Sequence, residues 1–599
     1  MKKHDTLRLA WHFLKGCKVA FFMAIASTLI MTFTGMVSPQ IIRLALDNVL
    51  LGSSETSAAA GAFLSLLGGA DYLKDNLWVL ALILLGVAFV AFFAHYSFRV
   101  TSTLGAETFT KNIRDQLYGR IAHLPFSWHM KNHTGDIIQR CTSDVDTLKT
   151  FVSEQMTGIV RILLMAAMSV GFMYSMNWKM ATIAVAVMPV MVIYSLVFHK
   201  KIKKSFTECD EKEGEVSAMV QENLTGVRVV RAFGREGYEK EKFESFNRDY
   251  TALYVRLAKI MATFWASLDV ITGLELMVVI VCGAVFAVRG TITVGEYIAF
   301  ISYNGMLVWP VRMLGRLLSE MSKASVSLNR IGYIVRSEPE KDAPDAVETD
   351  MTGDISFEHV NFAYDNCPEL LHDVTFEVKA GTTVGIMGGT GSGKSTLMLL
   401  LDKLYDLEDP QSHIRIGGVD IRNVKTDYLR NNVGIVLQEP YLFSRTLKEN
   451  IGIKNEHITL ESIREAAKAA ALDDTVIAFP QGYDTFVGER GVTLSGGQKQ
   501  RAAIARVLTD DAPILVFDDS LSAVDTETDA LIRANLEKRF GTATIFLISH
   551  RVSTLRKADL IVVLEKGRIS EMGTHDELVK KDGLYNSIYQ AQTAGVEDL

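Results

Sequence analysis

The chain has 599 residues, of which 48% are hydrophobic, with a mean hydropathy of +0.18 and a formal net charge of −7 at pH 7. This length suits two or more domains, and the composition is too apolar for an ordinary soluble enzyme. The modest acidic balance leaves no basic footprint for nucleic acid. Five scattered cysteines without metal-ligand spacing give no sign of zinc, haem or iron–sulfur chemistry.

Six apolar stretches of about 20 residues or more fill the first half, and each is long enough to cross a bilayer as a helix. They lie near residues 17–45, 77–99, 153–177, 179–199, 259–289 and 293–318. Asn304, Pro310, Arg312 and Arg316 interrupt the sixth. The charged stretches 100–152 and 200–258 have helical apolar spacing, which predicts cytoplasmic extensions of membrane helices. Residues 52–76, rich in Ser, Gly and Ala, are predicted to form an outside loop.

Basic residues set the orientation. Lys2, Lys3 and Arg8 precede the first span, and further Lys and Arg residues follow the second and fourth spans. Because basic loops stay in the cytoplasm, an even number of spans places both the N-terminus and the second half of the chain inside. The first apolar run is too long for a cleavable signal peptide and lacks a small-residue cleavage site.

The second half opens with a phosphate-binding loop. Its residues, Gly388, Gly389, Thr390, Gly391, Ser392, Gly393, Lys394 and Ser395, fit the G-x-x-x-x-G-K-[ST] pattern. Glycines let backbone N–H groups surround phosphates, the lysine adds a charge, and the serine hydroxyl can hold Mg²⁺. An apolar run precedes the loop and a breaker-free run beginning at Thr396 follows it. This order predicts a strand, the loop and the N-terminus of a helix.

Other candidate site residues follow in the chain. Residues 513–518 read as a buried strand ending in Asp518, a carboxylate placed to hold Mg²⁺ beside the phosphates, although a capping role in a core strand is the simpler alternative. A second glycine-rich element spans residues 494–498. Gln438, Asp525 and His550 each follow an apolar stretch and are unremarkable singly.

As a set, these residues resemble the nucleotide-binding domain of an ATP-binding cassette (ABC) transporter, over residues 353 to about 592. The resemblance implies ATP and Mg²⁺ as ligands. It assigns Tyr364 to adenine stacking, the loop Gly388 to Ser395 with Thr396 to the phosphates, and Ser395, Gln438 and Asp518 to Mg²⁺. It assigns the signature residues Ser495, Gly496, Gly497 and Gln498 to ATP on a partner. Asp525 is assigned to communication between cassettes, and His550, with Gln438, to catalysis. Such a shared site implies a dimer.

The resemblance extends to the exporter architecture. It implies an all-α transmembrane domain (residues 1–336), a linker (337–352) and an α/β P-loop cassette (353–599). Residues 134–140 with Asp144, and residues 226–233, resemble the intracellular loops that carry the coupling helices, although a solvated charged face is the alternative. Residues 485–491 resemble a loop that touches the membrane domain, with Phe486 where the family often has Glu.

The residue after Asp518 departs from the family pattern. Asp519 stands where the catalytic carboxylate is normally Glu, and its side chain is shorter by about 1.5 Å, one C–C bond. Since phosphoryl transfer depends on positioning, a miss of this size costs on the order of a hundredfold in rate. The signature is intact. The chain therefore resembles the degenerate-site subunit of a heterodimeric exporter, while drift in a still-active site is the alternative.

Two acidic residues, Asp269 and Glu275, lie in the fifth apolar stretch, where ionisable groups are costly and usually functional. Six positions apart, they cannot share one helix face. Glu275 is the candidate for cation recognition, and a structural hydrogen bond is the alternative.

The resulting prediction is a half-transporter in a bacterial cytoplasmic membrane, exporting amphipathic, multidrug-type small molecules with a second, similar chain. A lipid or peptide exporter, and an ATP-binding regulatory subunit that gates its partner without hydrolysis, are the alternatives.

Overall fold

The computed structural model describes residues 11–52, 58–365, 367–455, 457–488, 491, 493–521, 524–539 and 541–597. The basic residues Lys2, Lys3 and Arg8 used for orientation lie outside these ranges. The chain divides into two compact units. The helical unit comprises Met1–His123 and Asn132–Glu338, and the α/β unit comprises Leu124–Lys131 and Pro339–Leu599.

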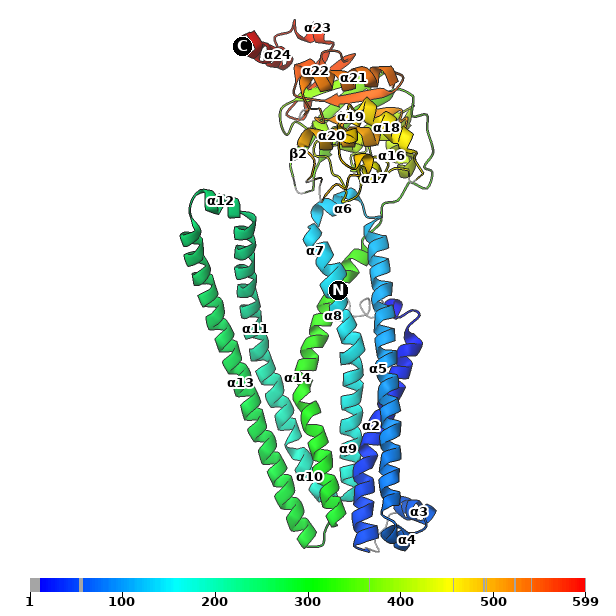
Figure 1. The fold of residues 1–599 in the computed structure, drawn as a ribbon, viewed down its shortest axis with the longest axis vertical. Helices are drawn as coiled ribbons and strands as arrows, with labels where there is room; N and C mark the ends of the chain where they lie inside the picture. The colour runs from blue at the N-terminus through cyan, green and yellow to red at the C-terminus, as the bar shows by residue number, and fades with distance from the viewer. Residues whose placement is uncertain are drawn as a thin grey trace. The chain divides into compact units, whose positions relative to one another are not determined.

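A set of helices, most of them long, makes up the helical unit. They are α2 (Lys18–Leu44), α5 (Trp78–Ile121), α9 (Met156–Met176), α10 (Trp178–Ala186), α11 (Met188–Thr225), α13 (Glu236–Val288) and α14 (Val294–Arg336). Shorter elements join them: η1 (Ala45–Leu50), α3 (Ala58–Leu66), α4 (Ala70–Asp75), α7 (Thr134–Gln139), η2 (Arg140–Asp144), α8 (Val145–Thr150), η3 (Phe151–Gln155) and α12 (Val227–Ala232). Figure 1 shows α11 and α13 as a long hairpin closed by α12.

The predicted outside loop at 52–76 is partly helical, because α3 and α4 lie within it. Its alanines, taken as loop composition, are the strongest helix formers. Residues 53–57 lie outside the described ranges.

Five helical stretches of the described residues are long and apolar enough to cross a membrane: Lys18–Leu50, Trp78–Ile121, Thr134–Met176, Trp178–Thr225 and Glu236–Val288. The sixth predicted span falls in α14, a 43-residue helix with Pro310 inside it. α14 is not among these five. Its polar interruptions, seen in the sequence, lower its hydropathy without breaking the helix.

Local caps fix where helices begin. The Asn177 side chain accepts hydrogen bonds from the backbone N–H groups of Lys179 and Met180 at the start of α10. α14 begins with a capping box in which Thr293 and Glu296 bond each other's backbone N–H groups. These side chains satisfy donors that a helix N-terminus otherwise leaves unpaired.

Two sheets form the α/β unit. The first, antiparallel, has the order β2-β1-β4-β5, from β1 (Ile355–Ala363), β2 (Glu369–Val378), β4 (His413–Ile416) and β5 (Val419–Asp420). The second has the order β10-β9-β3-β8-β7-β6, from β3 (Thr383–Gly388), β6 (Val433–Val436), β7 (Ile514–Asp518), β8 (Thr544–Ile548), β9 (Leu560–Glu565) and β10 (Arg568–Gly573). All its pairs are parallel except β9–β10. Every residue of β7 and β8 is buried, as parallel strands covered on both faces require.

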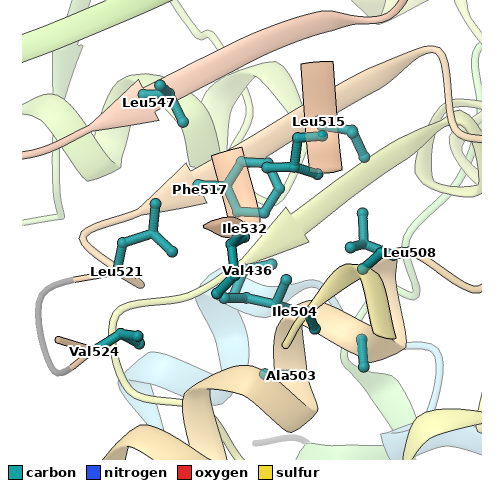
Figure 2. Packing of buried hydrophobic residues seen from close by; sticks show 14 of the residues in the cluster. Val436, Ala503, Ile504, Leu508, Leu515, Phe517, Leu521, Val524, Ile532 and Leu547 are labelled. Atoms are coloured by element: carbon teal, nitrogen blue, oxygen red, sulfur yellow. The ribbon is translucent and has the colours of Figure 1, made fainter. Parts of the chain in front are cut away.

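Helices lie between and after these strands in the chain. They are α15 (Lys394–Leu401), α16 (Thr426–Asn432), α17 (Leu447–Ile451), α18 (Leu460–Ala469), α19 (Asp473–Ile477), α20 (Gly496–Val507), α21 (Thr526–Arg539), α22 (Val552–Leu555), α23 (His575–Leu578) and α24 (Leu584–Glu597), with the short turns η4 (Ile421–Asn423) and η5 (Gly482–Asp484). Figure 2 shows Ile504 of α20 beside Val436 of β6 and Phe517 of β7, all within one buried cluster. This packing fixes the N-terminus of α20, which begins in the signature, relative to the sheet.

The linker after α14 is bound to the α/β unit. Glu340 accepts hydrogen bonds from both terminal nitrogens of Arg430, at 2.8 and 2.7 Å. Asp342 accepts from the backbone N–H and the hydroxyl of Thr426 at 2.9 and 2.6 Å. Nearby, Asp402 follows α15 and is 5% exposed. Burial raises the pKa of its carboxyl to about 7, against the nearby Arg430 charge, which lowers it.

Candidate nucleotide-binding site and membrane acids

The phosphate loop adopts the predicted strand–loop–helix order, with β3 ending at Gly388 and α15 beginning at Lys394. Gly391 and Gly393 have φ of +78° and +96°, in the left-handed region that favours glycine. A Cβ on Gly393 would lie 2.4 Å from Leu371 Cδ2. Glycine at this position therefore allows both the turn and the close packing on β2 that hold the loop open for phosphates.

Lys394 is folded back onto its own loop. Its Nζ donates to the carbonyl oxygens of Gly388 and Gly389 at 2.9 and 2.7 Å. Burial lowers the pKa of this ammonium group, while the Asp518 and Asp519 charges oppose the shift. Since these acceptors are loop carbonyls, a phosphate can replace them without breaking an ion pair.

A carboxylate and a hydroxyl meet beside the loop. Asp518 ends β7, is 6% exposed, and is hydrogen-bonded by Ser395. Burial raises the pKa of the Asp518 carboxyl, the Asp519 charge adds to the rise, and Ser395 and Lys394 oppose it. Two oxygen donors at a buried, acidic position fit Mg²⁺, which prefers hard oxygen ligands.

Asp519 and His550 face each other. His550 Nδ1 lies 3.2 Å from Asp519 Oδ1, and the backbone N–H of Asp519 donates to Ile548 O at 3.0 Å. The φ of Asp519 is +43°, which is uncommon for a residue with a side chain. The backbone of His550 is held in turn by Gln592 Nε2, which donates to its carbonyl oxygen at 2.7 Å. The structure thus brings together a shortened carboxylate and a histidine from two neighbouring strand ends.

The signature residues form a helix start. The Ser495 hydroxyl accepts from the Gln498 backbone N–H at 3.3 Å, and Gln498 Oε1 accepts from the Ser495 backbone N–H at 2.9 Å. Gly496 and Gly497 open α20, a 12-residue helix whose N-terminal dipole favours an anion. Asp525 precedes α21 and accepts from the Thr528 backbone N–H at 3.0 Å. The starts of α20 and α21 thus carry small or capping residues.

Gln438 lies two residues beyond β6, the strand next to β7. Phe486 is 57% exposed and makes an isolated antiparallel bridge with Thr446. Residues 489 and 490 of the same predicted contact loop lie outside the described residues.

An aromatic chain that sequence reasoning missed reaches the predicted adenine residue. The Tyr364 hydroxyl lies 2.8 Å from Thr396 Oγ1, and its ring meets the Tyr405 ring edge to face at 5.1 Å. Tyr405 in turn meets Phe126 of α6 (Phe126–Lys131) at 5.5 Å and 87°. Lys131 pairs with Asp365 at 2.5 Å. The sequence signal for this chain was weak: one aromatic residue, Tyr364, precedes α15, and another, Tyr405, follows it.

The two segments predicted to carry coupling helices lie in the helical unit, whereas α6 belongs to the α/β unit. Residues 134–140 belong to the helical unit, where Asp136 accepts hydrogen bonds from Arg330 of α14 and from Arg140, both at 2.5 Å. The second segment holds α12, with Val229 and Phe233 exposed by 61% and 76%. Of the first loop, it is α6 that packs within the α/β unit, because its Phe126 and Lys131 find an aromatic and an acidic partner there.

The two acidic residues of the fifth apolar stretch, Asp269 and Glu275, have different surroundings. Asp269 pairs with Arg312 of α14 at 2.6 Å. Glu275 is 2% exposed, and neither carboxyl oxygen has a hydrogen-bond partner among the described residues. The Asn304 side chain, fully buried on α14, is likewise without a partner in that part of the chain. Asp269 therefore has a structural partner, and Glu275 does not.

Comparison with known proteins matches both halves of the chain to one family. Residues 20–311 match the ABC transporter transmembrane region and residues 371–522 match the ABC transporter domain. The chain is 36% identical over 484 residues to the putative multidrug export ATP-binding/permease protein YgaD of Bacillus subtilis, covering 80% of this chain and 83% of that protein. It is 33% identical over 518 residues to an ATP-dependent lipid A-core flippase of Desulfotalea psychrophila, covering 86% and 90%.

A solved structure also matches. The structure of a bacterial Atm1-family ABC exporter with ATP bound has a TM-score of 0.79 at 27% identity, covering 96% of this chain and 98% of that one. A phosphate cradle joined to a set of long apolar helices defines an ATP-driven membrane transporter. The chain belongs to the ABC transporter family, as an exporter-type half-transporter in which the transmembrane region is fused to an ATP-binding cassette.

Proposed function

We propose that this half-transporter exports amphipathic small molecules across a bacterial cytoplasmic membrane as one half of a heterodimer, and that its own ATP site hydrolyses slowly. The observation that carries the proposal is Asp519, the shorter carboxylate after Asp518. Several relatives, among them YgaD, are named as multidrug transporters, which supports a multidrug-type substrate.

The proposed site works through positioning. Ser395, Gln438 and Asp518 would hold Mg²⁺, which would supply positive charge beside the phosphates. Lys394 and the loop N–H groups would bind the phosphates, and Tyr364 would stack on adenine. Asp519, already beside His550, is about 1.5 Å too short to orient the attacking water well, which costs on the order of a hundredfold in rate. Ser495, Gly496, Gly497 and Gln498 complete the partner's site, and Asp525 connects the two cassettes.

The test compares the two sites in the purified complex. Asp519→Asn should change ATP hydrolysis by less than about twofold, whereas neutralising the partner's catalytic carboxylate should remove nearly all of it. Asp474→Asn, an exposed carboxylate of the same cassette, is the matched control. If Asp519→Asn stops hydrolysis as completely as the partner's substitution, Asp519 is a working catalytic carboxylate and the asymmetric arrangement is wrong.

For substrate recognition, we propose Glu275. Its carboxyl is buried without a partner among the described residues, as is the Asn304 side chain on the next helix, α14. Such a group is costly to retain, and it suits a site that receives a cation when the helices separate. A lipid cargo is the second candidate, because relatives of similar identity are named lipid A-core flippases. Transport into inverted vesicles of a labelled cationic dye and of a labelled lipid, each dependent on ATP, separates the two.

A further inference from the structure

A groove in the helical unit lies between α2, α5, η3 and α9, with a volume of about 310 Å³. Six of its lining residues matter for the argument: Met31, Phe98, Arg99, Thr103, Glu154 and Arg161. The groove therefore combines two apolar side chains with two guanidinium groups and one carboxylate.

The two arginines mark the cytoplasmic boundary of the membrane. Residues 78–98 of α5 and 162–178, from α9 into α10, contain no Asp, Glu, Lys or Arg, so Arg99 and Arg161 are the first charges at one end of each apolar run. α5 continues from Arg99 into its charged extension, and α9 follows the charged segment that ends near Glu154. Both guanidinium groups thus lie where hydrocarbon meets the inner head-group layer.

The groove has hydrogen-bond donors to spare. Among the described residues, neither the Arg99 nor the Arg161 guanidinium group forms an ion pair or a hydrogen bond, and the Thr103 hydroxyl donates no hydrogen bond. The other hydroxyls are committed: Ser102 donates to Ser153 O at 2.7 Å, and Thr157 to the same oxygen at 3.1 Å. Both arginines are exposed, so an anion can reach their guanidinium groups at the membrane boundary. The planar fork of arginine matches phosphate oxygens two at a time.

We propose that this groove binds the phosphate head of an anionic amphiphile from the inner leaflet. Arg99 and Arg161 hold the phosphate, Thr103 adds a hydroxyl donor, and the apolar portion lies against Met31 and Phe98. Glu154 repels a second anionic group and accepts hydrogen bonds from head-group hydroxyls. Basic pockets between membrane helices on the cytoplasmic side bind such head groups. The site is independent of the heterodimer and of Glu275.

The test uses the purified full chain and two lipids carrying the same fluorophore, phosphatidylglycerol and phosphatidylcholine. The native chain should bind phosphatidylglycerol in preference. Arg99→Gln and Arg161→Gln should each weaken that binding about fivefold, which corresponds to ~1 kcal/mol per basic residue near an anionic surface, and leave phosphatidylcholine binding unchanged. Arg248→Gln, which removes one exposed guanidinium from α13, is the matched control and should bind as the native chain does.

Two further measurements make the result decisive. Basal ATP hydrolysis in phosphatidylcholine should be unchanged in each variant, which shows that the variants are folded. If a variant fails this check, Arg99→Lys replaces it, because lysine keeps the charge but lacks the planar guanidinium group. In a competition experiment, inorganic phosphate is added at the same concentration as the labelled phosphatidylglycerol. Displacement of the lipid supports the anion site and assigns it to a soluble phosphate, whereas no displacement assigns the site to a lipid. Unchanged preference for phosphatidylglycerol in both arginine variants overturns the proposal, as does an equal loss in Arg248→Gln.

Discussion

Replacing Asp402 by asparagine should stabilise the cassette, and more so at higher pH. The Asp402 carboxyl is 5% exposed, one of its oxygens has no hydrogen-bond partner among the described residues, and burial raises its pKa from 3.8 to about 7. Between these values the folded protein holds a proton that the unfolded chain has lost. The free energy of unfolding therefore falls as pH rises through this window, by about 4 kcal/mol at most.

Asp402→Asn keeps the shape of the side chain and removes the titration. At about pH 8 the variant should unfold several degrees above the native chain, and at about pH 5 the gain should shrink to less than half, because the native carboxyl then holds its proton. Differential scanning fluorimetry of the purified full chain, following the cassette transition, measures both values. The exposed Asp474→Asn serves as the control. An equal gain at both pH values would refute the argument, because a gain independent of pH arises from packing and not from the buried charge.

Three other substitutions test the site residues. Tyr405→Ala should weaken ATP binding by a few-fold, since an edge-to-face pair contributes about 0.5–1.5 kcal/mol, whereas Tyr405→Phe should bind nearly as the native chain does; equal loss in both would place the effect in the hydroxyl. Glu275→Gln should weaken transport of cationic substrates and spare neutral ones at unchanged basal ATP hydrolysis, and a loss across both classes would contradict recognition. Ser495→Arg should abolish transport and most hydrolysis by the complex, because it blocks the N-terminus of α20; near-normal turnover would show that the partner's site is not the working one.

The parts of the fold that sequence predicted are those set by adjacent residues. The phosphate loop lies between β3 and α15 as expected, and Asp518 ends a fully buried strand, because glycine spacing and a continuous apolar run are local signals. The contact between Asp519 and His550 needed the strand order, which places β7 beside β8. No pattern in either segment alone contains that order.

Other features depend on contacts between distant segments. The sequence does not show which of Asp269 and Glu275 has a partner, and in the structure only Asp269 finds a cation, Arg312, on the neighbouring helix. Asp402 stands at an ordinary helix end and acquires its raised pKa only through burial in the folded cassette, against the opposing Arg430 charge. Composition predicted residues 52–76 as a loop, although alanine is a strong helix former and α3 and α4 lie within this range.

The eight residues Leu124–Lys131 belong to the cassette's compact unit although most of the helical unit separates them from it in the chain. During synthesis this segment leaves the ribosome long before the strands it packs against. Phe126 must wait without its partner Tyr405 until the membrane helices have been made. Domains generally fold as units in the order of their synthesis, and contacts between distant segments form late. A cassette produced from the linker onward would therefore leave the Tyr405 face bare, and membrane insertion and cassette folding are steps of one ordered process.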